Sequence, residues 1–385
     1  MELSLSNLAA FTDYFVSRHE AIVAFTRALV EVESPSGDEN GSKAVVSLLA
    51  AAAAGINRVT TIDRVVSEDY GEHLRLTAFG ESREKPIIII GHTDTVHPLG
   101  SLNERPWRIE GNRAYGPGVF DMKANCALAL EVIRACAAMG SPKRPVVLLL
   151  TCDEETGSRT GRHLVETEAR RAHAVLVLEP PASGGRVKTA RKGTGIFTIE
   201  ARGRAAHAGL EPENGASAIL ELAKQTARLH SLNGSAGGIS VNVGVFHGGT
   251  LSNVVAESAT AEIDIRFTTA DEAAMIEKEI RSLPPFDERV HLIVKGGINR
   301  PPLERNEKVV KLYHHARAIA GELNFSLEET QVGGASDGNF AAAAGAPVLD
   351  GLGIDGDGAH ASHEHISLDD IPRRGALLAG LITTL

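Results

Sequence analysis

The chain has few cysteines and no long apolar run, and these two shortages exclude several kinds of protein. Its three cysteines are Cys126, Cys136 and Cys152, and no CxxC pair is present. A sparse, odd-numbered set is typical of a reduced cytosolic protein rather than of a disulfide-bonded framework. The longest run of small apolar residues, 48–54, is far shorter than the roughly 20 residues that a membrane-spanning helix requires. Residues 1–15 show neither the basic region nor the apolar core of a signal peptide, so we expect a cytoplasmic protein.

The chain is also short of positive charge, because 39 lysines and arginines stand against 49 aspartates and glutamates, for a formal net charge of −10. Nucleic acid and anionic membrane surfaces are bound through basic faces, so we expect neither as a partner. The net charge does not constrain the substrate, since a few local arginines can reverse the field inside a pocket. With 43% hydrophobic and 23% charged residues, the composition is that of an ordinary globular protein.

A chain of 385 residues exceeds the usual size of one hydrophobic core, so two domains are expected. Short β-branched or leucine-rich runs at 86–91, 145–151 and 174–179 predict strands buried on both faces of a largely parallel sheet. Segments between them, such as 121–138 and 159–170, predict helices. This alternation indicates an α/β fold, with a mixed, largely parallel sheet flanked by helices.

The pattern changes after the loop at 180–185. Residues 195–201 alternate between apolar and polar side chains, as a half-exposed antiparallel strand does. The predicted elements from there follow the order β-α-β-β-α-β, which is that of a ferredoxin-like unit. We therefore expect a catalytic metal-binding domain over 1–190 and 300–385, interrupted by an inserted α+β domain over 191–299.

Carboxylate and imidazole side chains follow the three predicted buried strands. In chain order they include His92, Asp94, Glu154, Glu155 and Glu179. Ligands collect at the carboxyl ends of the strands of a parallel sheet, so we expect these side chains to line one pocket. Adjacent carboxylates in a dry pocket would repel one another, and a divalent cation removes that conflict. A solvated loop or surface pair is the alternative for each motif taken alone.

Two further candidates come from other parts of the chain. Asp121 follows a glycine-rich turn, and it is either a helix N-cap or a carboxylate that bridges two cations with one oxygen for each. His360 is the candidate ligand in the histidine cluster 358–365, although His363 or His365 could replace it on chemistry alone.

Taken together, these segments resemble the zinc-dependent aminoacylase and carboxypeptidase superfamily, which includes acetylornithine deacetylase, succinyl-diaminopimelate desuccinylase and the folate-hydrolysing glutamate carboxypeptidases. The matching stretches are GHTDTV at 91–96, YGPGVFDMK at 115–123, DEETGS at 153–158, LEP at 178–180, GRAAHAG at 203–209 and GAHASHEH at 358–365. The segments LSNVV at 251–255 and IPRR at 371–374 look nearest the glutamate carboxypeptidases. The resemblance implies a dizinc exopeptidase fold with an inserted dimerisation or lid domain.

The resemblance also implies two Zn²⁺ per subunit, with Co²⁺ or Mn²⁺ able to substitute. His92 and Glu179 would hold one ion, and Glu155 and His360 would hold the other. Asp121 would bridge the two ions, which suits a separation of roughly 3.5–4 Å.

Further roles carry over to matched positions. Glu154 would be the general base toward a metal-activated water, and it would deliver the proton to the leaving nitrogen. Asp94 would orient His92 through the second ring nitrogen. His207 would stabilise the tetrahedral oxyanion from the partner subunit of a homodimer formed through the inserted domain. A helix N-cap is the alternative role for His207, which small residues flank.

Substrate recognition follows from fewer residues. Asn253 and Arg266 match positions that hold a substrate carboxylate in the carboxypeptidases, and Arg300 resembles a second such arginine. A guanidinium offers a planar fork to a carboxylate. A solvated surface charge is the alternative for Arg300. The turn at 333–338, which includes Gly334, could add backbone N–H donors to the same pocket.

The leading hypothesis is a dizinc metallohydrolase that cleaves the amide bond to a C-terminal amino acid, above all glutamate, in a small acyl-amino acid or peptide. An N-acyl-amino-acid deacylase with the same metals is the alternative enzyme. A non-catalytic dimeric binding protein on the same fold is the alternative of a different class. Two departures leave the choice of substrate open, because Met122 stands where many glutamate carboxypeptidases have a second acid, and Ala124 replaces the family's next glycine.

Overall fold

The computed structural model describes residues 5–140, 142–234 and 237–385, which form two compact units. Unit 1 comprises the described residues up to Thr189, Arg305–Val332 and Ser336–Leu385, and unit 2 comprises Ala190–Glu304 and Gly333–Ala335. Each unit has a hydrophobic core of its own. No helix of the described residues is long and apolar enough to cross a membrane.

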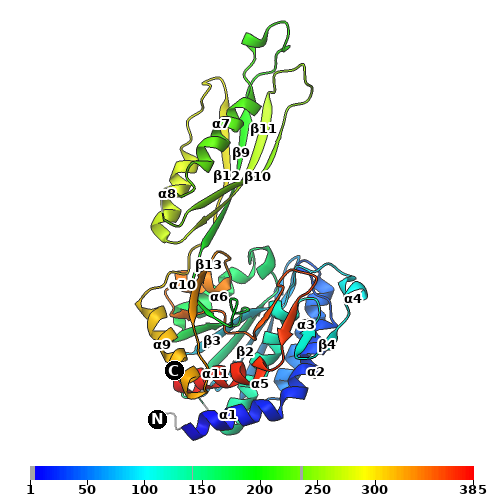
Figure 1. The fold of residues 1–385 in the computed structure, drawn as a ribbon, viewed down its shortest axis with the longest axis vertical. Helices are drawn as coiled ribbons and strands as arrows, with labels where there is room; N and C mark the ends of the chain where they lie inside the picture. The colour runs from blue at the N-terminus through cyan, green and yellow to red at the C-terminus, as the bar shows by residue number, and fades with distance from the viewer. Residues whose placement is uncertain (1–4, 141, 235–236) are drawn as a thin grey trace. The chain divides into compact units, whose positions relative to one another are not determined.

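Unit 1 is built around a six-stranded sheet with the strand order β1-β2-β6-β3-β7-β14 (Figure 1). Its strands are β1 (Val59–Ser67), β2 (Gly71–Ala78), β3 (Ile87–His92), β6 (Val146–Thr151), β7 (Ala174–Val177) and β14 (Val348–Leu349). Neighbours in the row β6-β3-β7-β14 pair in parallel, whereas β1 with β2 and β2 with β6 are antiparallel. The prediction of a mixed, largely parallel sheet is confirmed.

The central strands β3, β6 and β7 are apolar on both faces, and every one of their residues is buried. Such strands need a covering layer on each face of the sheet, and helices supply it. The helices of unit 1 are α1 (Leu5–Ser17), α2 (His19–Val30), α3 (Glu39–Ala54), α4 (Ser101–Glu104), α5 (Ala124–Met139), α6 (Gly161–Arg171), α9 (Glu307–Glu322), α10 (Asp337–Ala343) and α11 (Asp370–Thr384).

Two small sheets are also present, and the sequence patterns predicted neither. One has the order β15-β16-β5-β4, from β4 (Arg108–Glu110), β5 (Arg113–Tyr115), β15 (Gly356–Asp357) and β16 (His365–Ser367). The other is formed by β8 (Val187–Arg191) and β13 (Glu329–Val332). Strands of two to five residues have too little periodicity to be recognised in a sequence. The first sheet matters for the site because it pairs His365 with Tyr115, which joins two distant parts of the chain.

Unit 2 has the expected order β-α-β-β-α-β. Its elements are β9 (Gly193–Arg202), α7 (Ala218–His230), β10 (Ser240–Gly248), β11 (Ser258–Phe267), α8 (Ala270–Arg281) and β12 (His291–Arg300). The strands form an antiparallel sheet in the order β10-β11-β9-β12. Both helices pack against this sheet, and alternate residues such as Ile263 and Ile265 of β11 enter the core that they enclose.

Candidate metal centre

The carboxyl ends of three adjacent parallel strands supply the first residues of the site. His92 is the last residue of β3, Glu155 lies in the short turn Glu154–Thr156 after β6, and Glu179 follows β7. Because β3 lies between β6 and β7, the three strand ends deliver their side chains to one place.

Asp121 arrives from a separate turn and lies between two imidazoles. Gly118, with a φ of 70°, opens the turn, and Asp121 and Met122 then have non-helical backbone angles. The next helix therefore begins later than predicted, and Asp121 is not its N-cap. The Oδ1 atom of Asp121 lies 3.0 Å from Nε2 of His92, and its Oδ2 atom lies 3.4 Å from Nε2 of His360.

The two oxygens of Asp121 belong to two overlapping groups of side chains. One group is His92, Asp121 and Glu179, and the other is Asp121, Glu155 and His360. In each group, one potential ligand atom per residue lies within 4.8 Å of the others. Nε2 of His92 lies 3.5 Å from Oε1 of Glu179, and Nε2 of His360 lies 3.2 Å from Oε2 of Glu155. The structure thus brings together all five residues that were expected as ligands.

This donor set fits two divalent cations. Each group offers an imidazole nitrogen and carboxylate oxygens, which are ligand types that zinc and related ions accept. Within the described part of the chain, Oε1 of Glu155 is buried without a hydrogen-bond partner. A buried carboxylate oxygen in that condition requires a further partner, and a cation would supply it. Asp121 presents one oxygen to each group, as a bridging ligand must.

The electrostatics of the site favour positive charge. Hydrogen bonds to Asp121 and Glu155 raise the pKa of His360 to about 10. Burial acts to lower the pKa of His92, but hydrogen bonds to Asp121 and neighbouring carboxylates raise it well above its ordinary value. Burial raises the pKa of Glu155. Crowded carboxylates of this kind are stabilised by any nearby positive charge, whether a proton on an imidazole or a bound cation.

Asp94 fastens the end of β3 to the turn after β6. Its backbone oxygen lies 2.9 Å from Nδ1 of His92, and its carboxylate oxygen Oδ1 lies 3.5 Å from the same nitrogen. The carboxylate accepts hydrogen bonds from the backbone N–H groups of Glu154 and Glu155, at 3.2 and 3.1 Å, and from the Ser36 hydroxyl at 2.6 Å. Asp94 therefore holds both the ring of His92 and the turn that carries the two glutamates.

Met122 occupies a site that suits an apolar side chain. It is fully buried in the core of unit 1, and its sulfur accepts a hydrogen bond from the backbone N–H of His92 at 3.3 Å. Its methyl group lies so close to Gly91 that a β-carbon there would come within 2.4 Å of it. A carboxylate at this position would face the core instead of water, which is costly without a partner.

Of the histidines in the cluster 358–365, the structure brings His360 against the carboxylates. His363 and His365 belong to neither of the two groups found among the described residues. The ring of His365 lies 5.0 Å from that of Tyr115, and its Nδ1 atom lies 2.9 Å from the backbone oxygen of His363. Tertiary geometry thus separates three candidates that chemistry alone left open.

Unit 2 carries the residues that were expected to bind substrate. The guanidinium of Arg266 donates from two nitrogens to the carboxylate of Asp264, at 2.7 and 2.8 Å. Arg300 is buried at the end of β12, so it is not the solvated charge considered as its alternative. Arg266 and Arg300 both lie opposite Thr194 of β9, one on each side, and hence at the same level of the sheet.

His207 and Asn253 lie near each other, since the backbone N–H of Ala208 donates to the backbone oxygen of Asn253 at 2.9 Å. His207 is exposed, and its Nδ1 atom accepts a hydrogen bond from the backbone N–H of Gly209 at 3.1 Å. It caps neither of the helical segments that follow it in unit 2. Both residues lie beyond the last residue of β9, whereas the two arginines lie level with its start.

The segment 334–338 reads Gly-Ala-Ser-Asp-Gly, which has the form of a serine-hydrolase nucleophile turn. Ser336, however, is fully buried and caps α10, and its hydroxyl donates to Oδ2 of Asp350 at 2.7 Å. Because this hydroxyl is fully buried, a substrate cannot reach it, and Ser336 does not serve as a nucleophile. The carbonyl of Gly334 accepts a hydrogen bond from Arg191 at 3.1 Å.

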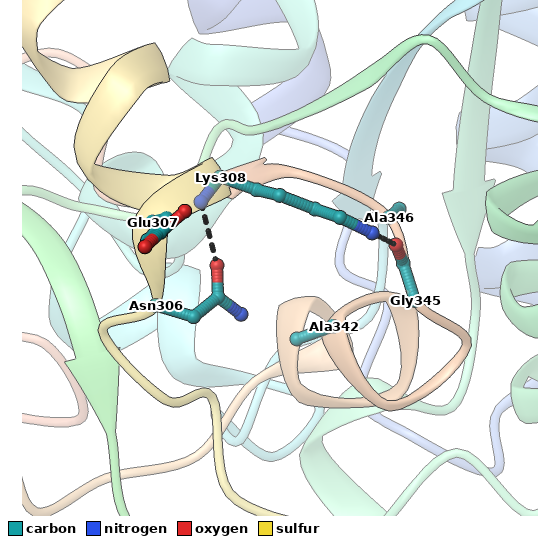
Figure 2. Close-up of a pocket in the computed structure, with 6 residues that line it drawn as sticks. All are labelled: Asn306, Glu307, Lys308, Ala342, Gly345 and Ala346. Atoms are coloured by element: carbon teal, nitrogen blue, oxygen red, sulfur yellow. Dashed lines mark hydrogen bonds between the residues drawn. The ribbon is translucent and has the colours of Figure 1, made fainter.

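A surface hollow of about 360 Å³ lies elsewhere in unit 1, between the start of α9 and the end of α10. Figure 2 shows the side chain of Lys308 extending across it, so that its Nζ atom donates to the backbone oxygen of Gly345 at 3.0 Å. Glu307 is the one carboxylate in its lining, which contains no imidazole or thiol. The hollow therefore lacks the side chains for metal binding or acid–base chemistry.

Comparison with known proteins agrees with this geometry. The model for "Peptidase family M20/M25/M40" matches residues 88–384. Carboxypeptidase G2 from Pseudomonas sp. (strain RS-16) is 31% identical over 375 residues, which are 95% of this chain and 89% of that protein. A succinyl-diaminopimelate desuccinylase from Verminephrobacter eiseniae is 29% identical over 310 residues, or 74% of this chain and 75% of that protein.

Solved structures share the fold. The aminopeptidase PepT from Bacillus cereus has a TM-score of 0.77 at 22% identity, covering 95% of this chain and 98% of that chain. A dinuclear metal-binding peptidase of the M20 family from Bacillus subtilis has a TM-score of 0.70 at 13% identity, covering 95% and 98%. The chain belongs to peptidase family M20/M25/M40 and is a metallohydrolase, as its motifs predicted.

His73, a buried residue of β2, is not among the residues that the sequence motifs single out. Its Nδ1 atom accepts a hydrogen bond from the backbone N–H of Cys152 at 3.2 Å, so the neutral ring carries its proton on Nε2. Nε2 lies 3.0 Å from the hydroxyl of Thr160, which donates to Asp153 at 2.9 Å. This chain of bonds anchors the loop that bears the two glutamates, and a lone histidine in a strand gives no sign of it in the sequence.

Burial lowers the pKa of His73 below its ordinary value of 6.5. The His73 ring therefore takes up a proton more readily in the unfolded chain than in the folded protein. The stability that depends on the neutral ring is present above pH 6.5. This stability is lost as the pH falls through 6.5 toward the lower pKa of the folded protein.

The pH dependence of stability tests this effect. As the pH falls from about 7.5 to about 5, we expect the unfolding free energy of the metal-free wild type to decrease more steeply than that of metal-free His73→Gln. Urea denaturation measures both free energies.

His247→Gln, at an exposed position of β10, is the control and should keep the wild-type pH dependence. Equal slopes for wild type and His73→Gln would show that the buried ring does not contribute.

Proposed function

We propose that the protein is a dizinc carboxypeptidase that releases a C-terminal glutamate from a peptidyl or N-acyl amide. The observation that carries this proposal is the Asp121 carboxylate shared by two ligand groups, with Glu154 on the adjoining turn. The similarity to carboxypeptidase G2, which extends over 95% of this chain, supports a carboxypeptidase reaction.

The five residues of the two groups would hold two cations, for which we propose Zn²⁺. Bound cations of this kind would polarise the substrate carbonyl and lower the pKa of the attacking water. The chain's own contribution is to hold the ligands in place before the substrate arrives. Asp94 does so for His92 and for the turn that carries Glu155.

Glu154 is the proposed general base and acid. It shares a turn with Glu155, but it belongs to neither ligand group. Its backbone N–H is held by the Asp94 carboxylate at 3.2 Å, so its position next to the ligands is fixed. A carboxylate placed in this way can take a proton from the attacking water and deliver it to the leaving nitrogen.

Replacement of Glu154 tests this role. We expect Glu154→Ala and Glu154→Gln to retain two equivalents of metal and to lose about a hundredfold or more in turnover, since a general base contributes that much. Glu155→Gln is the contrasting variant, and its metal content should fall because it removes a ligand. Metal analysis and hydrolysis of an aroyl- or peptidyl-glutamate should be measured on the same preparations.

Unchanged turnover in both Glu154 variants would remove Glu154 from the mechanism. A wild-type protein that takes up no zinc or cobalt and hydrolyses none of the amides would instead favour a non-catalytic dimeric binding protein.

Arg266 is the proposed partner of the substrate carboxylate. It lies on the face of the sheet away from the core, because its neighbours in the alternation, Ile265 and Phe267, enter that core. Its fork is held in a planar, bidentate geometry by Asp264, and its side chain is 35% exposed. A substrate carboxylate would share or replace this interaction. Arg300, on the other side of Thr194, and Asn253 are proposed as additional contacts.

We expect Arg266→Ala to raise KM for carboxylate-bearing substrates by roughly tenfold or more, the cost of a lost charged hydrogen bond, while metal content stays unchanged. Arg202→Ala is the matched control, because Arg202 also pairs with a carboxylate two residues earlier on its strand, that of Glu200 at 2.8 Å. KM should be unaffected in the control. An unchanged KM in Arg266→Ala would show that the carboxylate is held elsewhere.

A homodimer through unit 2 is the proposed assembly. Strand β10 is an edge of the sheet, and Val245 and Phe246 on it are exposed. Ile219 of α7 is also exposed and lies beside Gly248 of the same strand. An edge strand with exposed apolar side chains is suited to association with a second copy.

The position of His207 also supports a dimer. His207 lies beyond Arg202, the last residue of β9, whereas Arg266 and Arg300 pair with Thr194 near the start of that strand. The stretch from Thr194 to Arg202 alone spans roughly 26 Å in an extended strand. One small substrate cannot contact both ends of the same unit. We therefore propose that His207 and Asn253 act on the substrate held by the partner subunit.

Mixing two inactive variants tests this arrangement. If His207 acts across the dimer, Glu154→Gln and His207→Ala refolded or co-expressed together should recover about a quarter of wild-type activity, since half of the dimers are mixed and each has one intact site. Each variant alone is the control. If mixing restores no activity although mixed dimers form, His207 acts within its own subunit or not at all.

An N-acyl-amino-acid deacylase is the second candidate, which the 29% identity to a succinyl-diaminopimelate desuccinylase and the presence of Met122 favour. The two reactions differ in which side of the amide is bulky. A panel of N-acetyl, N-succinyl, aroyl and peptidyl substrates on the zinc-loaded protein separates them.

A further inference from the structure

Glu364 is a buried carboxylate in the loop that follows His360, and it is 3% exposed. Its Oε1 atom accepts hydrogen bonds from the backbone N–H groups of Phe120 and Asp121, at 2.9 and 3.0 Å. Its Oε2 atom accepts one from the backbone N–H of Gly118 at 2.8 Å. The same oxygen lies 2.6 Å from Nε2 of His97, which is the donor because a carboxylate oxygen accepts.

These bonds hold the turn that presents Asp121. The turn between β5 and α5 has irregular backbone angles, so its N–H groups cannot all be satisfied within a helix. Glu364 satisfies those of Gly118, Phe120 and Asp121 together. A buried N–H left without an acceptor costs about 1–3 kcal/mol. Loss of this carboxylate would therefore favour a different backbone conformation of the turn.

The same segment places the other side of the site. Glu364 lies four residues after His360, whose ring faces Oδ2 of Asp121 and Oε2 of Glu155. The backbone of the segment is also tied to the turn, since the N–H of Gly116 donates to the carbonyl of Glu364 at 3.4 Å. The hydrogen bonds of Glu364 therefore help to set the separation of Asp121 and His360, two proposed ligands that are far apart in the chain.

His97 holds the carboxylate of Glu364 through the hydrogen bond from its Nε2 atom. It is buried, and its Nδ1 atom lies 3.4 Å from the guanidinium of Arg105. His97 lies five residues after His92, so this contact links the chain leaving β3 to the other two segments. Three stretches that each supply a proposed ligand thus meet at one carboxylate.

Glu364 does not itself serve as a ligand. A carboxylate has about four acceptor positions, and the four contacts to Gly118, Phe120, Asp121 and His97 use them. It also lies outside both ligand groups of the described residues.

We propose that Glu364 is a positioning residue for the metal centre, which holds the bridging carboxylate of Asp121 at the correct distance from His360. This inference rests on the proposed dinuclear site. It adds a residue whose effect passes through the backbone of the turn, and not through contact with a cation or a substrate.

Glu364→Gln tests the proposal with almost no change of volume. The amide can accept on one side, but its NH₂ group faces N–H donors on the other, so the turn loses part of its support. We expect the affinity for Zn²⁺ or Co²⁺, measured by competition with a chelator, to fall about 10–100-fold, as is usual when a residue that orients metal ligands is removed. The visible absorption of the Co²⁺ form should also change, because that spectrum reports ligand geometry.

Glu221→Gln is the matched control in unit 2. Glu221 is 2% exposed and likewise holds backbone N–H groups, those of Phe286 and Asp287 at 3.0 Å. We expect this variant to lose stability but to keep the metal affinity and the Co²⁺ spectrum of the wild type. Loss of metal affinity in both variants to the same degree would assign the effect to general destabilisation and overturn the proposal.

His97→Leu is the second variant, because it removes one bond to Glu364 and leaves the three backbone bonds in place. We expect His97→Leu to weaken metal binding by less than Glu364→Gln does, and to keep the circular dichroism spectrum of the wild type. If Glu364→Gln does not fold, this variant decides, and wild-type affinity and spectrum in it would overturn the proposal. If the wild type itself binds no cation, the proposed function fails. If the wild type binds two and a folded Glu364→Gln binds them equally well, the positioning role alone fails.

Discussion

The structure of this site depends on one constraint, which is the crowding of carboxylates around Asp121. Its two oxygens face His92 on one side and His360 on the other, and Glu155 has a buried oxygen without a partner among the described residues. Such an arrangement is stable only with positive charge nearby. The central sheet of unit 1, the turn before α5 and the loop that contains His360 together hold these side chains close to one another.

The ligand side chains are positioned in different ways on the two sides of the site. His92, Glu155 and Glu179 follow neighbouring parallel strands, so the sheet itself positions them. Asp121 and His360 lie in loops, where no ladder of hydrogen bonds fixes the backbone. The buried carboxylate of Glu364 supplies the missing rigidity, because it accepts hydrogen bonds from the backbone of the turn that carries Asp121. On the other side of the site, Asp94 adds to the support from the sheet by holding the turn of Glu154 and Glu155.

Unit 2 has a separate core and a different arrangement of functional candidates. Arg266 and Arg300 lie level with one end of β9, and His207 and Asn253 lie beyond the other. A ten-residue strand keeps these pairs apart, so they cannot act on one small molecule within one unit. Arg266, the proposed partner of the substrate carboxylate, already donates to Asp264, so a substrate would have to compete with Asp264 for its guanidinium.

The sequence by itself determined the mixed α/β sheet, the ferredoxin-like order of unit 2, the family and the candidate ligands, because buried strands, turns and strand-end motifs are local patterns. Tertiary structure alone decided between His360 and its neighbours, showed that Arg300 is buried, and revealed the hydrogen bonds of the buried side chains of His73 and Glu364. Those bonds join residues that are distant in the chain, such as Glu364 and Gly118. Short strands and side-chain hydrogen bonds to the backbone leave no periodic pattern, so the sequence does not predict them.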